Sequence, residues 1–180
     1  MRVITGKARG IALKTPNGSA TRPTADRVKE AMFSIIQFDI PTARVLDLFG
    51  GTGQLGIEAL SRGAAYAVFV DEKEDACKLI RENLNRTRMM NDARVIRSDY
   101  SAFLKNCTDR FDIILLDPPY AEVFLENSLK MITEIDILQS GGIIVTERPQ
   151  GKELTMEFPG YARSRDYKYS NTILTIYRKD

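Results

Sequence analysis

The stretch that decides the fold is Phe111-Asp-Ile-Ile-Leu-Leu-Asp-Pro-Pro-Tyr120. Its apolar run, Ile113 to Leu116, stops abruptly at a carboxylate, two prolines and an aromatic ring. Apolar runs bounded by turn residues are typical of central strands in parallel sheets, and ligands of such sheets bind beyond the carboxyl ends of the strands. The Asp-Pro-Pro-Tyr end therefore indicates a site that holds a flat heterocycle by its amino group. A plain strand-ending turn is the alternative.

A second segment, Arg44-Val-Leu-Asp-Leu-Phe-Gly-Gly-Thr-Gly-Gln-Leu-Gly56, begins as a short strand and becomes rich in glycine. Gly51, Gly53 and Gly56 satisfy the pattern G-x-G-x-x-G. Glycines allow the backbone to turn tightly and to approach a ligand at the N-terminus of the helix that follows. By itself this pattern is weak evidence, so the residues around it decide between possible ligands.

Asp47, directly before the glycines, favours one ligand over another. A carboxylate there would repel a pyrophosphate by about 4 kcal/mol at a separation of ~4 Å and an effective dielectric of ~20. It would attract the ammonium and sulfonium groups of S-adenosylmethionine, whose carboxylate suits a helix N-terminus. The sequence thus favours S-adenosylmethionine over NAD, and an Asp47 that only caps the turn is the alternative.

Acids also end the second and third predicted strands. Asp71, or as second choice Glu72, is expected to bridge the ribose hydroxyls of the ligand. Asp99 and Tyr100 are expected to accept the adenine amino group and flank the ring, although a helix N-cap at Asp99 is as compatible with the sequence. Four strand ends should therefore share one rim of the sheet, at Asp47, Asp71, Asp99 and Asp117.

The composition fits a single domain of 180 residues with 43% hydrophobic residues. Its two cysteines, Cys77 and Cys107, are expected to be reduced thiols in a cytoplasmic protein. The chain has no histidine, which excludes a Ser-His or Cys-His triad and a His-ligated zinc, and we expect no metal. No apolar run of 18 residues and no signal peptide are evident, so we expect no membrane partner.

The net charge of +2 conceals an uneven distribution. Residues 1–30 hold seven basic and two acidic side chains, whereas the rest of the chain has a small acidic excess. A basic arm on a mildly acidic domain suggests contact with nucleic acid, and a solvated charged face is the alternative.

Alternation of strand and helix patterns predicts a doubly wound, mostly parallel α/β sheet. Strands are expected at 44–49, 67–71, 93–97, 111–116 and 142–147, with helices at about 53–62, 73–89, 99–105 and 122–134. The tail predicts an antiparallel hairpin, and the first 15 residues predict a basic β-hairpin followed by a helix at about 24–37. We therefore divide the chain into a basic extension, 1–40, expected to face nucleic acid, and an α/β domain with the ligand site, 41–180.

Together, Asp-Leu-Phe-Gly-Gly-Thr-Gly and Asp-Pro-Pro-Tyr resemble motifs of amino-group methyltransferases of the seven-stranded class. Four further segments resemble the bacterial small-subunit ribosomal RNA guanine-N2 methyltransferase family nearly end to end. These segments are Arg2-Val-Ile-Thr-Gly-Lys-Ala-Arg-Gly, Thr21-Arg-Pro-Thr-Ala-Asp-Arg-Val-Lys-Glu-Ala-Met-Phe, Leu55-Gly-Ile-Glu-Ala-Leu-Ser-Arg-Gly-Ala and Tyr169-Ser-Asn-Thr-Ile-Leu. The Arg-Pro-Thr segment is the specific part, because DNA and protein methyltransferases share the other two motifs.

The resemblance implies a role for each matched position. It implies an S-adenosylmethionine site at Asp47, Phe49, Gly51, Gly53, Asp71, Asp99 and Tyr100, beside the second-choice Glu72, and an amine pocket at Asp117, Pro118, Pro119 and Tyr120. It places Arg22, Pro23 and Thr24 near the cofactor or the RNA. The expected RNA contacts are Arg2, Lys7, Arg9, Arg22 and Arg27. The implied partner is 16S ribosomal RNA in an assembled or partly assembled small subunit.

Three other functions stay open from the sequence. A DNA or protein amino-group methyltransferase would share the Asp-Pro-Pro-Tyr chemistry. An NAD-dependent oxidoreductase would share the glycine pattern, although Asp47 and the terminal hairpin disfavour it. A non-catalytic RNA-binding module would bind RNA without affinity for S-adenosylmethionine.

Overall fold

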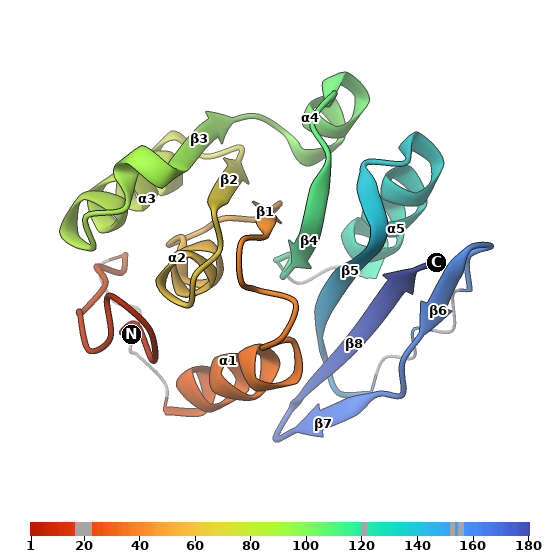
Figure 1. Cartoon of the computed structure of the whole chain (residues 1–180), viewed down its shortest axis with the longest axis horizontal. Helices are drawn as coiled ribbons and strands as arrows, with labels where there is room; N and C mark the ends of the chain where they lie inside the picture. Colours follow the sequence, from red (N-terminus) through yellow and green to blue (C-terminus); the bar gives the residue numbers. More distant parts are fainter. Residues whose placement is uncertain (17–22, 120–121, 152–153, 155–156) are drawn as a thin grey trace.

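The structure is a computed structural model that describes residues 1–16, 23–119, 122–151, 154 and 157–180. One twisted sheet lies between two layers of helices (Figure 1). In chain order the elements are α1 (Pro23–Ile35), β1 (Arg44–Asp47), α2 (Gln54–Ser61), β2 (Tyr66–Asp71), α3 (Glu74–Arg86), the 3₁₀ helix η1 (Met90–Asp92), β3 (Ala93–Arg97), α4 (Tyr100–Asn106), β4 (Phe111–Leu116), α5 (Glu122–Ile135), β5 (Leu138–Pro149), β6 (Tyr161–Arg163), β7 (Tyr167–Tyr169) and β8 (Thr172–Lys179).

The strand order is β3-β2-β1-β4-β5-β8-β6, and β1 to β5 run parallel. From β1 the chain winds outward to β3 and then crosses back to β4 on the other side of β1. The strand order therefore reverses between β1 and β4, and doubly wound sheets bind their ligands at such a switch point. The predicted α/β architecture is confirmed, including the antiparallel hairpin at the C-terminus.

The seventh position of the sheet is divided between two short strands. Both β6 and β7 pair with β8, which gives a sheet of eight strands in seven positions. The predicted C-terminal hairpin has one continuous first strand, from Tyr161 to Tyr169, but the chain leaves the ladder between Arg163 and Tyr167. In that gap Asp166 turns to the buried Arg148 of β5, with the Arg148 Nη2 and Asp166 Oδ2 atoms 2.6 Å apart.

Each face of the sheet has its own hydrophobic core. Side chains alternate between the faces of a strand, so Val45, Ile113 and Val145 pack with α1, α2, α3 and the N-terminal segment. Their neighbours along the strands, such as Leu46 and Ile114, pack with α4 and α5 on the other face. This alternation also determines which face each strand end presents to the site. No helix in the described part of the chain has the length and apolar content to span a bilayer.

Residues 1–16 follow the predicted hairpin only in outline. The two arms meet at one bridge, Arg2 to Ala12, instead of forming a ladder. The reason is that the N–H groups of Ile4 and Thr5 donate to the side chain of Glu58 in α2. They therefore cannot pair with the other arm of the hairpin. Apolar residues of this segment and of α1 share the core of the sheet. The division at residue 40 stays a prediction.

Candidate active site

A cavity of about 1950 Å³ opens where the parallel strands end, across the switch point between β1 and β4. The structure brings most of the predicted site residues to its lining: Asp47, Phe49, Gly51, Asp71, Glu72, Asp99, Tyr100, Asp117, Pro118 and Pro119. Gly53 does not line the cavity. Tyr120 and Arg22 lie outside the described residues.

The glycine-rich loop is held by the acid that ends β2. Asp71 accepts hydrogen bonds from Gly51 N–H and Lys73 N–H, each at 2.9 Å. Gly53 adopts a φ of 78°, a left-handed conformation that favours glycine, and turns the chain into α2. A Cβ on Gly56 would lie 2.3 Å from the Phe69 ring, so this glycine lets α2 pack directly on β2. Asp71 thus positions the loop as well as facing the cavity, and Glu72 beside it is exposed.

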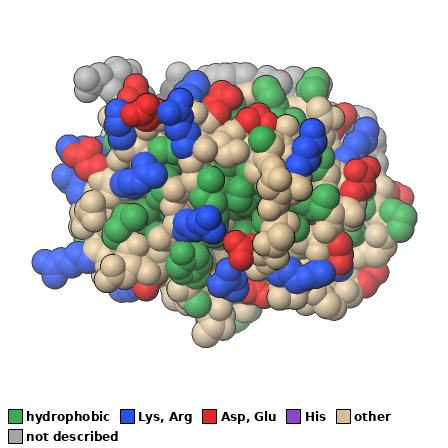
Figure 2. All heavy atoms as spheres, turned by 90° about the horizontal axis from the view of Figure 1, so that it is seen from above, with side chains coloured by type: hydrophobic (Ala, Val, Ile, Leu, Met, Phe, Trp, Pro, Cys, Tyr) green, Lys and Arg blue, Asp and Glu red, His purple; other side chains and the backbone are tan. Residues whose placement is uncertain are grey.

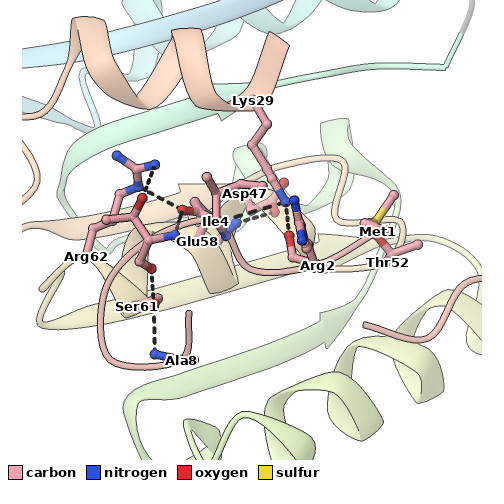
Figure 3. Close-up of polar contacts among 12 residues, drawn as sticks. Met1, Arg2, Ile4, Ala8, Lys29, Asp47, Thr52, Glu58, Ser61 and Arg62 are labelled. Carbon is pink, nitrogen blue, oxygen red and sulfur yellow. Dashed lines mark hydrogen bonds and ion pairs between the residues drawn. The ribbon is translucent and has the colours of Figure 1, made fainter. Parts of the chain in front are cut away.

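Asp47 lies at the floor of the cavity, almost fully buried. Its Oδ2 atom accepts the N–H of Gly56 at 3.0 Å, and this bond ties the end of β1 to the first turn of α2 (Figure 3). Burial, together with the charges of Asp117 and Asp71, raises the pKa of Asp47 to about 7, and the Gly56 hydrogen bond opposes this shift. A cationic ligand would favour the ionised form and oppose this shift.

Asp99 caps helix α4. Its Oδ1 atom accepts the backbone N–H groups of Ser101 and Ala102, at 2.9 and 3.1 Å, and the Ser101 hydroxyl. These bonds lower the pKa of Asp99, with the Ser101 hydroxyl as the largest cause. The structure therefore contains the helix N-cap that the sequence left open as an alternative. The adenine contact of Asp99 stays a prediction, and the Oδ2 atom would have to make it because Oδ1 already accepts three hydrogen bonds.

Three aromatic rings form a continuous row in the lining. Phe49 and Tyr100 lie 5.4 Å apart between centroids, and Phe124 at the start of α5 meets Tyr100 edge-on at 5.7 Å. All three line the cavity. Such a row offers an apolar surface for a planar ring, and Phe124 is a member that the sequence analysis did not identify.

Asp117 follows the last residue of β4 and is half-buried beside Pro118. Burial raises the pKa of Asp117 to about 6. No described residue donates a hydrogen bond to its carboxylate, in contrast to Asp47, Asp71 and Asp99. Its acceptor capacity is thus available to a ligand in the cavity.

Two further polar side chains line the cavity and were missed by the sequence analysis. Glu147 lies at the end of β5, and burial together with the charge of Asp117 raises its pKa to about 8. Gln54 begins α2, and its buried Oε1 atom has no hydrogen-bond partner in the described structure. Glu147 ends the predicted strand 142–147 just as Asp71 ends the predicted strand 67–71, so the sequence contains a signal that could have identified it.

The N-terminal segment is fastened to α2 by buried polar groups (Figure 3). Glu58, fully buried, accepts the N–H groups of Ile4 and Thr5 at 2.8 and 3.0 Å and that of Arg62 Nε at 2.8 Å. The Ser61 hydroxyl accepts the Ala8 N–H at 3.0 Å and donates to the Thr5 carbonyl at 2.6 Å. These bonds fix the segment directly against the helix that follows the glycine loop.

The segment also reaches the glycine loop itself. The Thr52 hydroxyl donates to the Met1 sulfur at 3.3 Å. The buried Asn83 amide donates to the carbonyls of Thr52 and Lys14, at 2.9 and 3.0 Å, and accepts the Lys14 N–H at 2.7 Å. One amide of α3 therefore holds the end of the N-terminal segment and the glycine loop together.

Four of the five predicted RNA contacts lie in the described structure. Arg2, Lys7, Arg9 and Arg27 are exposed. Lys7 forms an ion pair with Asp92 at 3.2 Å. On the face shown in Figure 2, basic side chains are interspersed with acidic and apolar ones. RNA contact by these side chains stays a prediction, as does Arg22.

No group of three or more Cys, Asp or Glu side chains in the described part of the chain has the arrangement to hold a metal ion.

Known proteins similar to this chain are found along its whole length. A family model described as conserved hypothetical protein 95 matches residues 1–178. YlbH of Bacillus subtilis (strain 168), provisionally named an rRNA methyltransferase, is 40% identical over 182 residues, which are 99% of this chain and 99% of that protein. Ribosomal RNA small subunit methyltransferase D of Escherichia coli (strain K12) is 34% identical over 147 residues, which are 82% of this chain and 74% of that protein.

A solved structure agrees with the fold described above. The structure of yhhF from Escherichia coli, provisionally named a methyltransferase, superimposes with a TM-score of 0.90 at 28% identity. The match covers 100% of this chain and 98% of the other.

Proposed function

This chain belongs to the family described as conserved hypothetical protein 95, and from that membership we propose that it transfers a methyl group from S-adenosylmethionine to the N2 amine of a guanine in small-subunit ribosomal RNA. The relatives named as ribosomal RNA methyltransferases support the reaction and the class of substrate. A ribosomal substrate implies a cytoplasmic reaction. The observation that carries the proposal is that Asp117 and Asp47 line one cavity across the switch point of the sheet.

The residues present suit S-adenosylmethionine, which supplies an electrophilic methyl group on a sulfonium. The ligand's ammonium can be met by the Asp47 carboxylate and by the unpartnered Oε1 atom of Gln54. Asp71, with Glu72 as the second candidate, would hold the ribose hydroxyls. The row Phe49, Tyr100 and Phe124 would flank the adenine ring.

The guanine amine is a weak nucleophile because its lone pair is delocalised into the ring. We assign Asp117 and the Pro118 carbonyl as acceptors of its two hydrogens, which would favour a pyramidal nitrogen. Pro118 and Pro119 restrict the backbone, so the acceptors are in place before the base arrives. The nitrogen–carbon bond then forms as the sulfur–carbon bond breaks, and the amine afterwards releases one proton.

Orientation carries much of the rate. Aligning nitrogen, methyl carbon and sulfur is worth up to ~7–11 kcal/mol in favourable systems. Because the proton leaves after the transfer, the site needs no strong base, which agrees with a chain that has no histidine. Tyr120 is proposed to stack on the target base, a contact worth ~1–3 kcal/mol. The base must leave its stack to reach the cavity.

The exposed basic residues Arg2, Lys7, Arg9 and Arg27, together with Arg22, are proposed to contact the RNA backbone. Each lost phosphate contact should reduce the slope of log affinity against log salt by about 1. Arg9→Ala should therefore lower both the affinity and this slope. A slope unchanged in Arg9→Ala would remove that residue from the interface.

A transfer assay with tritiated S-adenosylmethionine tests the proposed function. The substrates are naked DNA, a protein extract, free 16S ribosomal RNA, and small subunits from cells lacking the gene. We expect label in the ribosomal RNA, above all in the subunits, and N2-methylguanine in its digest by mass spectrometry. Label only in DNA or protein, or on another base, would contradict the proposal, as would RNA binding without affinity for the methyl donor.

A further inference from the structure

Glu147 and Asp117 lie side by side at the ends of two neighbouring strands. Strands β4 and β5 run parallel with Leu116 opposite Thr146, so the next residues of the two strands, Asp117 and Glu147, are neighbours at the same edge. Adjacent strands are about 4.8 Å apart. Both side chains line the cavity and are half-buried.

The two side chains also share a face of the sheet. Leu115 and Val145 are paired and pack with α1 and α2. Side chains two residues apart lie on the same face of a strand, which brings Asp117 and Glu147 to this face together. Asp47 reaches the same face from β1, since it is paired with Leu115. Three carboxyl groups therefore meet on one side of the rim.

Within the described residues, the carboxylates of Glu147 and Asp117 have no hydrogen-bond or ion-pair partner, whereas those of other acids of the rim bind backbone N–H groups. Asp71 holds Gly51 and Lys73, and Asp99 caps α4. The guanidinium of Arg148 lies on the opposite face, where it contacts Thr175 Oγ1 and Asp166 Oδ2, each at 2.6 Å. Glu147 is thus not held by the fold for any evident structural purpose.

We infer that Glu147 is a specificity-determining residue that reads the N1–H and O6 edge of the target guanine while Asp117 holds the neighbouring N2 amine. The inference rests on the proposed function. The recognised edge of guanine presents an acceptor and two donors in the order O6, N1–H and N2–H. A neutral carboxylic acid matches the first two, since its carbonyl accepts from N1–H and its hydroxyl donates to O6. An ionised carboxylate matches the third.

The electrostatics of the rim support a neutral Glu147 beside an ionised Asp117. Burial and the charge of Asp117 raise the pKa of Glu147 to about 8, whereas burial raises that of Asp117 to about 6. Near pH 7 these shifts favour the neutral form of Glu147 and the ionised form of Asp117. Among the described residues, the charged side chains that line the cavity from β1, from the end of β4 and from β5 are Asp47, Asp117, Glu147 and Arg148. Burial and the charge of Asp117 also raise the pKa of Asp47. Adenine has a hydrogen at C2 in place of the amine, so it would offer no donor to Asp117.

Base analogues in the substrate test the assignment. The nucleotide methylated by the wild type is first mapped by mass spectrometry. Small subunits are then reconstituted with guanine or 2-aminopurine at that nucleotide. 2-Aminopurine keeps the N2 amine but lacks both the N1–H and O6. Values of kcat/KM on both substrates are compared for the wild type, Glu147→Ala, Glu147→Gln, and the control Glu134→Ala on the exposed part of α5.

We expect Glu147→Ala to reduce the preference for guanine over 2-aminopurine by about 10- to 100-fold, the range for a bidentate base contact. Glu147→Gln should keep the preference, because an amide also offers one acceptor and one donor. The wild-type preference should fall as the pH rises through about 8, whereas that of Glu147→Gln should not. The control variant should match the wild type in both substrates.

Two results would overturn the assignment. Glu147→Ala with the wild-type preference, even if both substrates react more slowly, would exclude base reading. A loss of preference in Glu147→Gln equal to that in Glu147→Ala would exclude the neutral-acid contact. Failure of the proposed function is distinguishable, because the wild type itself would then leave the ribosomal RNA unmethylated.

Discussion

Replacing Glu58 by alanine should destabilise the protein severely without touching the cavity lining. Glu58 is fully buried, and Lys29, also buried, lies 3.8 Å from it and donates to the Arg2 carbonyl at 2.7 Å. Burial lowers the pKa of Lys29, and the charge of Glu58 opposes that shift. The variant would leave this ammonium without its carboxylate and would remove the acceptor of the Ile4 and Thr5 N–H groups.

The expected loss follows from these contacts. Breaking a buried ion pair by removing one partner costs about 3–5 kcal/mol, and each buried donor left unsatisfied costs about 1–3 kcal/mol. Entry of water and loss of the Lys29 proton would offset part of this sum. We therefore expect a decrease of about 3–5 kcal/mol in the free energy of unfolding, a large share of the ~5–15 kcal/mol typical of a domain.

Urea unfolding followed by circular dichroism at pH 7 measures this change. Glu58→Gln keeps an acceptor for the backbone and should lose less than Glu58→Ala, which provides a second measurement if the alanine variant does not fold. The double variant Lys29→Met/Glu58→Gln removes the uncompensated charge and should recover part of the loss in Glu58→Gln. A cost below about 1 kcal/mol in Glu58→Ala would refute the view that this carboxylate fastens the N-terminal segment.

Three further predictions concern the rim and the packing of α2. Asp117→Asn should lower kcat at least ~100-fold while calorimetry shows unchanged binding of S-adenosylmethionine, because the lost acceptor acts on the amine; normal turnover would exclude the assigned role. Gly56→Ala should lower the free energy of unfolding by about 1–3 kcal/mol in thermal melts, since its Cβ would meet the Phe69 ring; an unchanged melt would contradict this packing. The raised pKa of Glu147 means that the folded state holds its proton more tightly than the unfolded state, so this group costs stability as the pH rises from about 4.5 to 8. Glu147→Gln should then be more stable than the wild type at pH 8 and equal to it near pH 4 in urea titrations, and the reverse order would contradict the shift.

Much of the fold follows from local patterns in the sequence. The strands at 93–97 and 111–116 have the predicted bounds, because apolar runs and turn residues define them. Strand β5 instead begins at Leu138, four residues before the predicted start, since Leu138 pairs with Phe111 ahead of a register shift. The break between β6 and β7 depends on an ion pair between Asp166 and Arg148, residues that are distant in sequence. Contacts between residues that are distant in sequence cannot be predicted from a local sequence pattern.

In the site, too, some residues could be predicted from local sequence patterns, whereas others depend on contacts between distant residues. The aspartates are predictable because each lies at or just after the end of an apolar strand, and the parallel sheet brings these ends together. Glu147 has the same position at the end of β5, so the same rule applies to it. The acceptor on Gln54 and the fastening role of Glu58 were not predictable, since both depend on burial and on partners outside their own helix.

The divided edge beside β8 has a consequence for behaviour at high concentration. A long, flat outer strand would present an unbroken row of backbone groups and invite other molecules to add to it. Here β6 and β7 contribute three residues each, and the ion-paired turn between them interrupts that row. Neither piece offers enough consecutive groups to template self-association. Mutation of Asp166 should therefore promote fibrous or amorphous aggregation as well as local loosening.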